Sequence, residues 1–314
     1  MIEQYLNKII QGDALEIIKT LPTESVDCII TSPPYFNLRD YGVDGQIGLE
    51  KTYQEFIKKL IDIFNEIKRV LKKEGTCFVN LGDSYSGSGK GRNGDGLAGK
   101  TESLNKNNKG TLEGRILKCD YGEIKTKSLM MIPERFAISM IDNGWILRNN
   151  LIWIKPNAMP ESVQDRWKKA HEYIFFFVKN KNYYFNLDAI RTPHKLVSVN
   201  RAEYEHGTEK YYSMPARQVK LNPKGACPPD YFLINTNCSE NDGSDNHYAT
   251  YPQNLISNPM LAGCPEKGIV LDPFMGSGTT GVVAKKSFRN YIGIELNPEY
   301  IKIANDRLSQ GTMF

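Results

Sequence analysis

The stretch 269–284, IVLDPFMGSGTTGVVA, decides the fold. Its apolar start is typical of a buried strand, and TTGVVA is typical of the opening turns of a helix. Between them, residues 276–281 have the spacing GxGxxG, in which glycines allow a tight turn and close approach of a ligand to the backbone. The next predicted strand, 290–296, carries Glu295, an acid placed to accept hydrogen bonds from ribose hydroxyls. This order predicts a site for an adenosine-containing ligand.

Two ligand classes use this geometry, dinucleotides and S-adenosylmethionine. Asp272 stands just before the glycines, where an anion would be poorly placed beside a pyrophosphate. A dinucleotide fold also needs several βαβ units after its fingerprint, and little more than one remains here. The sulfonium ligand is therefore favoured, and a nicotinamide-dependent oxidoreductase stays as the alternative. The rest of the sheet must come from the N-terminal part of the chain.

That N-terminal part has the required pattern. SVDCIIT (25–31) and GTCFVNLG (75–82) predict buried strands, and the segment 52–73 between them has the apolar spacing of a helix. Strand, helix and strand form a βαβ unit, which indicates a parallel sheet. We expect a further helix over 128–143, strands within 145–155 and 172–180, and a final helix from about Pro298.

The first of these strands leads into a second motif, Thr31-Ser32-Pro33-Pro34-Tyr35. Proline fixes φ and pushes the preceding residue into extended geometry, so this turn is stiff. Carboxyl ends of parallel strands meet at one edge of the sheet, so the turn should face the glycine motif. The Ser32 hydroxyl and Pro33 carbonyl can accept both hydrogens of an exocyclic amine, while Tyr35 stacks on its ring. Positioning and local dipoles would then promote methyl transfer without a strong base.

TSPPY together with DPFMGSGTT resembles the amino-methyltransferases of DNA, specifically the group in which the catalytic motif precedes the S-adenosylmethionine motif. The resemblance covers nearly the whole chain, and segments 12–22, 75–85, 152–162 and 247–256 also look like parts of this group. It implies an α/β, Rossmann-like methyltransferase fold. The expected sheet is mixed and seven-stranded, with helices on both faces and a small target-recognition region beside it.

The resemblance also implies the site residues and the cofactor. The catalytic set is Ser32, Pro33, Pro34 and Tyr35, the cofactor is S-adenosyl-L-methionine, and no metal is expected. Asp13 is expected to contact the adenine end of the cofactor. The full expected cofactor-binding set is Asp13, Thr31, Asp272, Pro273, Phe274, Gly276, Ser277, Gly278, Thr279, Thr280, Glu295, Asn297, His247 and Tyr248.

Charge is concentrated in two stretches. Residues 84–127, a loop without helical or strand period, contain nine cations and five acids. Residues 189–224 contain seven cations and three acids, with tyrosines interleaved. Each stretch has an excess of four positive charges, equal to the net charge of +4 of the whole chain, which suits contact with DNA phosphates. The candidate DNA contacts are Arg39, Lys155, Arg191, Lys195, Arg201 and Arg217.

The expected organisation has three parts: a catalytic part over 1–188, a target-recognition region over 189–245, and a cofactor-binding part of the same sheet over 246–314. The partner that the resemblance implies is double-stranded DNA, in which the target base would be flipped out to expose its amine. The resemblance also allows a cognate restriction endonuclease and a homodimer. A nucleic-acid-binding module with an inactive site is the remaining alternative.

Ser32 at the first position of the tetrapeptide favours cytosine N4 as the methyl acceptor, and adenine N6 is the alternative. The six cysteines are scattered, and neither a signal peptide nor a membrane-spanning run is visible, so we expect a cytoplasmic protein that associates with the nucleoid through DNA. Residues 94–101 match GxxxxGKT, the pattern of a phosphate-binding loop. Such a loop runs directly from a strand into a helix, and here no predicted strand ends directly before it and no predicted helix follows it, which argues against an ATP site.

Overall fold

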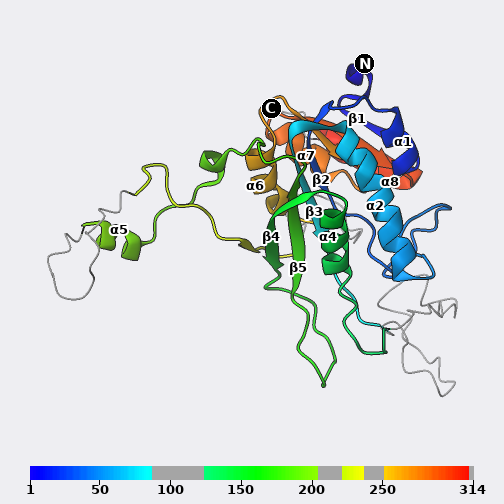
Figure 1. Cartoon of the computed structure of the whole chain (residues 1–314), viewed down its shortest axis with the longest axis horizontal. Helices are drawn as coiled ribbons and strands as arrows, with labels where there is room; N and C mark the ends of the chain where they lie inside the picture. Colours follow the sequence, from blue (N-terminus) through cyan, green and yellow to red (C-terminus); the bar gives the residue numbers. More distant parts are fainter. Residues whose placement is uncertain (87–123, 204–220, 237–250, 311–314) are drawn as a thin grey trace.

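The computed structural model describes residues 1–86, 124–203, 221–236 and 251–310, and for residues 201–203 it describes the backbone alone. Helices cover both faces of one eight-stranded sheet (Figure 1). The strands are β1 (Lys8–Gln11), β2 (Val26–Thr31), β3 (Leu71–Leu81), β4 (Ile146–Ile154), β5 (His171–Val178), β6 (Tyr231–Leu233), β7 (Ile269–Asp272) and β8 (Asn290–Glu295). The α-helices are α1 (Ala14–Thr20), α2 (Tyr53–Val70), α4 (Ile132–Asp142), α5 (Leu196–Glu203), α6 (Gln253–Gly263), α7 (Thr279–Lys286) and α8 (Pro298–Gln310), with short 3-10 helices η1 (Ile2–Tyr5) and η2 (Leu187–Ile190).

The strand order is β1-β8-β7-β2-β3-β5-β4-β6. Strands β1, β8, β7, β2 and β3 run parallel, and β5 and β4 form an antiparallel hairpin beside them. The C-terminal strands β7 and β8 lie between β1 and β2, so the N-terminal part of the chain completes the sheet as predicted. The mixed α/β sheet is confirmed, and it has eight strands rather than seven because Tyr231–Leu233 pairs with the outer edge of β4.

Two hydrophobic cores lie on opposite faces of the sheet. On one face, Val26 and Ile29 of β2 pack with helices α1, α2 and α4. On the other, Cys28 and Ile30 of the same strand pack with α6, α7 and α8. Cys28, Ile29 and Ile30 alternate as the two-residue period of a strand requires. Val26 lies on the face of Ile29 because the pairing register of β2 shifts between Val26 and Cys28. Because β2 is buried on both faces, the stiff turn that follows it has a fixed starting point.

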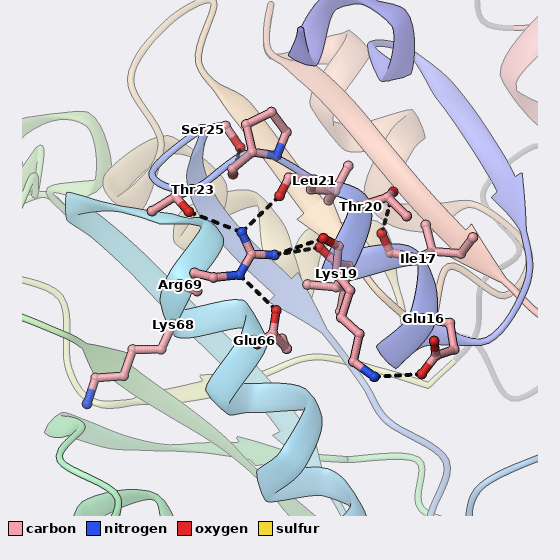
Figure 2. A network of polar contacts seen from close by, with 12 residues as sticks. Glu16, Ile17, Lys19, Thr20, Leu21, Thr23, Ser25, Glu66, Lys68 and Arg69 are labelled. Atoms are coloured by element: carbon pink, nitrogen blue, oxygen red, sulfur yellow. Dashed lines mark hydrogen bonds and ion pairs between the residues drawn. The ribbon is translucent and has the colours of Figure 1, made fainter.

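Helix α2 fixes the position of α1 through one arginine (Figure 2). The Arg69 guanidinium donates to the carbonyls of Leu21 (2.9 Å) and Ile18 (3.0 Å), and its Nε donates to Glu66 Oε2 (2.8 Å). The last carbonyls of a helix lack partners within the helix, so these bonds satisfy the C-terminus of α1. With its far end held, the N-terminus of α1 at Asp13 has a defined place beside β1.

Helix α4 begins at Ile132, four residues later than the pattern predicts. The Asp83 carboxylate, just beyond β3, accepts from the backbone N–H groups of Met131 (2.9 Å) and Ile132 (3.1 Å). These bonds set the first turn and tie α4 to the end of β3. Residues 87–123 of the basic stretch 84–127, which include 94–101, and residues 204–220 of the stretch 189–224 lie outside the described residues. In the part that the structure describes, no helix combines the length and apolarity needed to cross a bilayer.

Candidate functional site

A cleft opens at the carboxyl edge of the parallel strands. It is lined by residues that follow β1 (Gly12, Asp13), β2 (Ser32, Pro34), β7 (Pro273, Phe274, Gly276, Ser277) and β8 (Leu296, Asn297), together with Glu295 at the end of β8. The space between these walls is about 890 Å³ when its open mouth is included. Ser32 and Gly276 therefore face one shared space, and the two sequence motifs meet as the parallel sheet requires.

The glycine turn forms the floor of this cleft. Gly276 has φ +50°, and a Cβ placed there would meet no protein atom closer than 4.0 Å. The missing side chain thus leaves room for a ligand against the backbone. The Gly276 and Asn297 N–H groups donate to the two oxygens of Glu295, each at 2.8 Å. Burial raises the pKa of Glu295, and these two bonds act against that rise.

Gly278, the second glycine of the motif, serves packing rather than the cleft. It has φ +86°, and a Cβ there would lie 2.9 Å from the Cβ of Ala304 in α8. Arg307 of the same helix donates from Nη1 to the Ser277 carbonyl and hydroxyl (both 2.7 Å) and to Thr279 Oγ1 (3.3 Å). Helix α8 is thereby held against the turn. Gly278 and Thr279 do not line the cleft.

Asp272 lies behind the cleft as a buried junction. Its carboxylate accepts from Thr31 Oγ1 (2.7 Å), Thr280 Oγ1 (2.5 Å), the Phe274 N–H (3.0 Å) and the Tyr251 hydroxyl (3.2 Å). Burial raises the pKa of Asp272, while the Thr280, Thr31, Phe274 and Tyr251 hydrogen bonds lower it. The polar groups of Asp272, Thr31 and Thr280 are thus directed at one another, and none of the three lines the cleft, so their direct contact with the cofactor stays a prediction. Together they join β2, β7 and α7.

A wall of the cleft comes from residues that sequence reasoning missed. Tyr41, Val43, Gln46 and Ile47, in the loop after the Ser-Pro-Pro-Tyr turn, line it opposite Tyr300 of α8. The Tyr41 and Tyr300 rings lie 6.1 Å apart in an edge-to-face arrangement. The loop has neither helical nor strand period, so Tyr41 and the proximity of the loop to the turn were the available signals.

Tyr35 turns away from the cleft toward the ends of β3 and β5. Its hydroxyl donates to Glu172 Oε2 (2.6 Å) and lies 3.2 Å from Asn80 Oδ1. Burial raises the pKa of Tyr35 well above its ordinary value, Glu172 raises it further, and a side-chain hydrogen bond with Ser32 lowers it. The phenol therefore stays protonated and acts as a donor. Its partner Glu172 also forms an ion pair with Lys155.

This chain of contacts links Ser32, Tyr35, Glu172 and Lys155 at one edge of the sheet. The Lys155 ammonium lies 4.2 Å from the centre of the Trp153 ring. The side chains of Lys155 and Glu172 are only 17% and 13% exposed, so their pairing is partly shielded from water. Sequence reasoning missed Glu172 because it sits inside an apolar strand pattern, EYIFFFV, and its partners are distant in the chain.

The candidate DNA contacts separate into groups. Lys155 pairs with Glu172, and Arg191 pairs with Asp188 (2.6 Å), so both cations have an acidic partner within the chain, and their contact with DNA phosphates stays a prediction. Arg39 lies half-buried in the loop after the turn, and Lys195 is exposed just before α5. The remaining predicted positions lie outside what the structure describes: the Arg201 side chain, Arg217, His247 and Tyr248.

The family model for N6/N4 methyltransferases, described as DNA methylase, matches residues 26–306. The chain belongs to this family. Curated relatives support the assignment over almost the full length. The type II methyltransferase M.Cfr9I of Citrobacter freundii is 39% identical over 299 residues, which cover 95% of this chain and 86% of that protein. The type II methyltransferase M.SmaI of Serratia marcescens is 38% identical over 301 residues, covering 96% and 90%.

Solved structures share the fold of this N6/N4 family member. The PvuII DNA methyltransferase, described as cytosine-N4-specific, has a TM-score of 0.64 at 20% identity and covers 95% of this chain and 85% of its own. The complex of M1.HpyAVI with S-adenosylmethionine has a TM-score of 0.54 at 22% identity, covering 96% and 98%. These similarities establish the α/β methyltransferase fold.

Proposed function

We propose that this DNA methylase transfers a methyl group from S-adenosylmethionine to the exocyclic N4 of a cytosine flipped out of duplex DNA. One observation carries the proposal: Ser32, after β2, lines the same cleft as Gly276 and Glu295, after β7 and at the end of β8. A donor lying over the glycine turn and an amine at the Ser-Pro-Pro-Tyr turn would therefore be neighbours. Enzymes gain much of their rate from such positioning.

The cleft suits the proposed cofactor. Gly276 leaves open space at its floor, and the Glu295 carboxylate faces the cleft in a fixed orientation, where ribose hydroxyls could donate to it. Tyr41 and Tyr300 supply aromatic walls for a planar base, and Asp13 stands beside them at the N-terminus of α1. When bound, S-adenosylmethionine supplies an electrophilic methyl carbon attached to a sulfonium.

The residues of the chain would prepare the amine. The Ser32 hydroxyl and the Pro33 carbonyl would accept its two hydrogens, which turns the nitrogen lone pair toward the cleft floor. Pro33 is buried and Pro34 is half-buried, and the fixed φ angles of both prolines limit the ways in which these acceptors can move. Tyr35, protonated and held by Glu172, would support Ser32 and the face of the base rather than remove a proton. The mechanism therefore depends on orientation and on dipoles aimed at the amine.

Cytosine N4 is favoured over adenine N6 for two reasons. In family members the first position of the tetrapeptide, here Ser32, is often Ser for cytosine N4 and Asp for adenine N6. The PvuII DNA methyltransferase, which has the higher TM-score of the two structures named above, is described as cytosine-N4-specific. Adenine N6 stays as the alternative because its amine needs the same two acceptors. We infer the catalytic-motif-first order of the family for this chain, since β2 precedes β7 in sequence and pairs with it in the sheet.

Duplex DNA is the proposed partner, with 189–245 as target-recognition region beside the parts 1–188 and 246–314. The relatives named as type II methyltransferases support a role in restriction–modification with a cognate endonuclease. A homodimer is a further proposal that gel filtration would test.

The test is identification of the modified base. DNA incubated with the protein and S-adenosylmethionine would be digested to nucleosides and analysed by mass spectrometry. We expect N4-methylcytosine. N6-methyladenine would correct the base but keep the mechanism, whereas no methylated nucleoside, together with tight dinucleotide binding, would refute the proposal.

A further inference from the structure

The loop 155–170, which joins β4 to β5, extends beyond the carboxyl edge of the sheet (Figure 1). We call it the β4–β5 loop. It carries Trp167, whose side chain is 94% exposed, whereas Trp145 and Trp153 are each 3% exposed. An indole this exposed is available to contact a partner, and tryptophan is enriched at interfaces.

Several contacts fasten the β4–β5 loop next to the candidate site. The Arg166 guanidinium lies 4.0 Å from the centre of the Tyr85 ring and pairs with Glu161 at 2.6 Å. The Lys169 ammonium donates to the carbonyl of Asp83, just beyond β3. At the base of the loop, Lys155 pairs with Glu172, which holds Tyr35. Trp167 therefore stands on an anchored segment rather than on a free chain.

The charge around Trp167 indicates the chemistry of its partner. Trp167 lies in the run Arg166-Trp167-Lys168-Lys169, and the whole loop has four cations against two acids. An aromatic ring interleaved with cations fits the bases and phosphates of a nucleic acid. An acidic or apolar protein surface would not use both features as well. Duplex DNA is the occupant to which this surface is complementary.

We propose that the β4–β5 loop inserts Trp167 into the base stack of duplex DNA beside the flipped target base. Flipping a base costs a few kcal/mol in lost stacking and pairing. An aromatic side chain that occupies the vacated space restores part of that stacking. The exposed Lys168 would hold a flanking phosphate, while Arg166 keeps the loop anchored through Glu161 and Tyr85. This inference rests on the proposed function, since it needs a base to leave the duplex.

Tryptophan fluorescence provides a direct readout because the other two tryptophans are buried. The probe is a 30-base-pair duplex carrying the methylation site mapped by sequencing DNA from an expressing strain. Adding it should quench the emission of the wild-type protein and protect Trp167 from acrylamide. If the protection of Trp167 from acrylamide increases with protein concentration and does not depend on DNA, Trp167 contacts another copy of the chain and the proposal is overturned.

Kinetics separate this inference from the proposed function. Trp167→Ala should lower kcat/KM for the duplex about tenfold or more, the scale of one lost base–aromatic stack, and Trp167→Phe should recover part of it. A mismatch opposite the target base should shrink the defect, because flipping then costs less. Met159→Ala, at an 84% exposed position of the same loop, is the matched control and should behave as wild type.

The outcomes are distinct. If the wild-type protein methylates the duplex and Trp167→Ala is as fast as wild type on both matched and mismatched DNA, the insertion of Trp167 is refuted while the enzyme assignment stands. If the wild-type protein transfers no methyl group to DNA, the proposed function fails first. Because Trp167 is exposed, its variants should fold, which circular dichroism would verify.

Discussion

Replacing Asp272 with alanine should destabilise the fold before it affects the chemistry. The carboxylate serves four donors at once, and removing it leaves the Phe274 N–H and the hydroxyls of Thr31, Thr280 and Tyr251 without their acceptor. An unsatisfied buried group costs about 1–3 kcal/mol, although hydroxyls can turn to other acceptors and a backbone N–H cannot. We therefore expect a loss of about 1–3 kcal/mol in the free energy of unfolding for the Phe274 N–H, plus a smaller contribution from each hydroxyl that finds no new acceptor.

Urea unfolding of the cofactor-free protein, followed by tryptophan fluorescence, measures this loss. Asp272→Asn should lose less, because it keeps the side-chain volume and one acceptor and removes a charge whose burial raises the pKa. Asp306→Ala, on the exposed face of α8, is the control and should stay within about 0.5 kcal/mol of wild type. If Asp272→Ala unfolds like the control while its cofactor affinity collapses, the carboxylate faces the ligand and the reasoning is wrong.

Three further substitutions test other parts of the site. Glu172→Gln should lower kcat about ten- to a hundredfold by loosening Tyr35 and Lys155, with the cofactor Kd unchanged in calorimetry; an unaltered kcat would exclude a positioning role. A carboxylate accepts hydrogen bonds from ribose hydroxyls best when it is ionised. The affinity for the cofactor should therefore be highest at pH values above the raised pKa of Glu295 and should fall as the pH drops through that pKa. Titration calorimetry between about pH 8 and pH 5 checks this, and Glu295→Gln should bind more weakly without that slope. Gly278→Ala should cost about 3 kcal/mol or more in unfolding free energy, from left-handed strain plus the contact with Ala304. Gly42→Ala, at φ +69° with no atom within 4 Å of the added Cβ, should cost only about 1 kcal/mol, and equal losses would contradict the packing argument.

The elements that carry a strong local pattern could be predicted from the sequence. Strand β2, helix α2 and the strand–turn–helix around Gly276 follow from apolar period and glycine spacing, and the parallel sheet follows from their order. Strand β6 was missed because Tyr231–Leu233 is short and is defined only by its pairing with β4. The start of α4 was missed because Asp83, 49 positions before Ile132, sets it.

The same distinction applies to the site. The meeting of Ser32 with Gly276 follows from where parallel strands end, so topology alone predicts it. The role of Asp272 does not, because one of its donors, Thr31, lies 241 positions away. Lys155 and Arg191 have the charge of DNA contacts, yet Glu172 and Asp188 are close enough to pair with them. Long-range side-chain partners decide such roles, and a sequence pattern does not contain them.

The most direct test of the shared cleft is single-turnover transfer of a labelled methyl group to DNA by Ser32→Ala, measured beside its cofactor affinity. If Ser32 holds the amine over the donor site, transfer should fall about a hundredfold or more while the affinity for S-adenosylmethionine stays near wild type. Transfer at the wild-type rate would contradict the account, because the amine would then be held elsewhere.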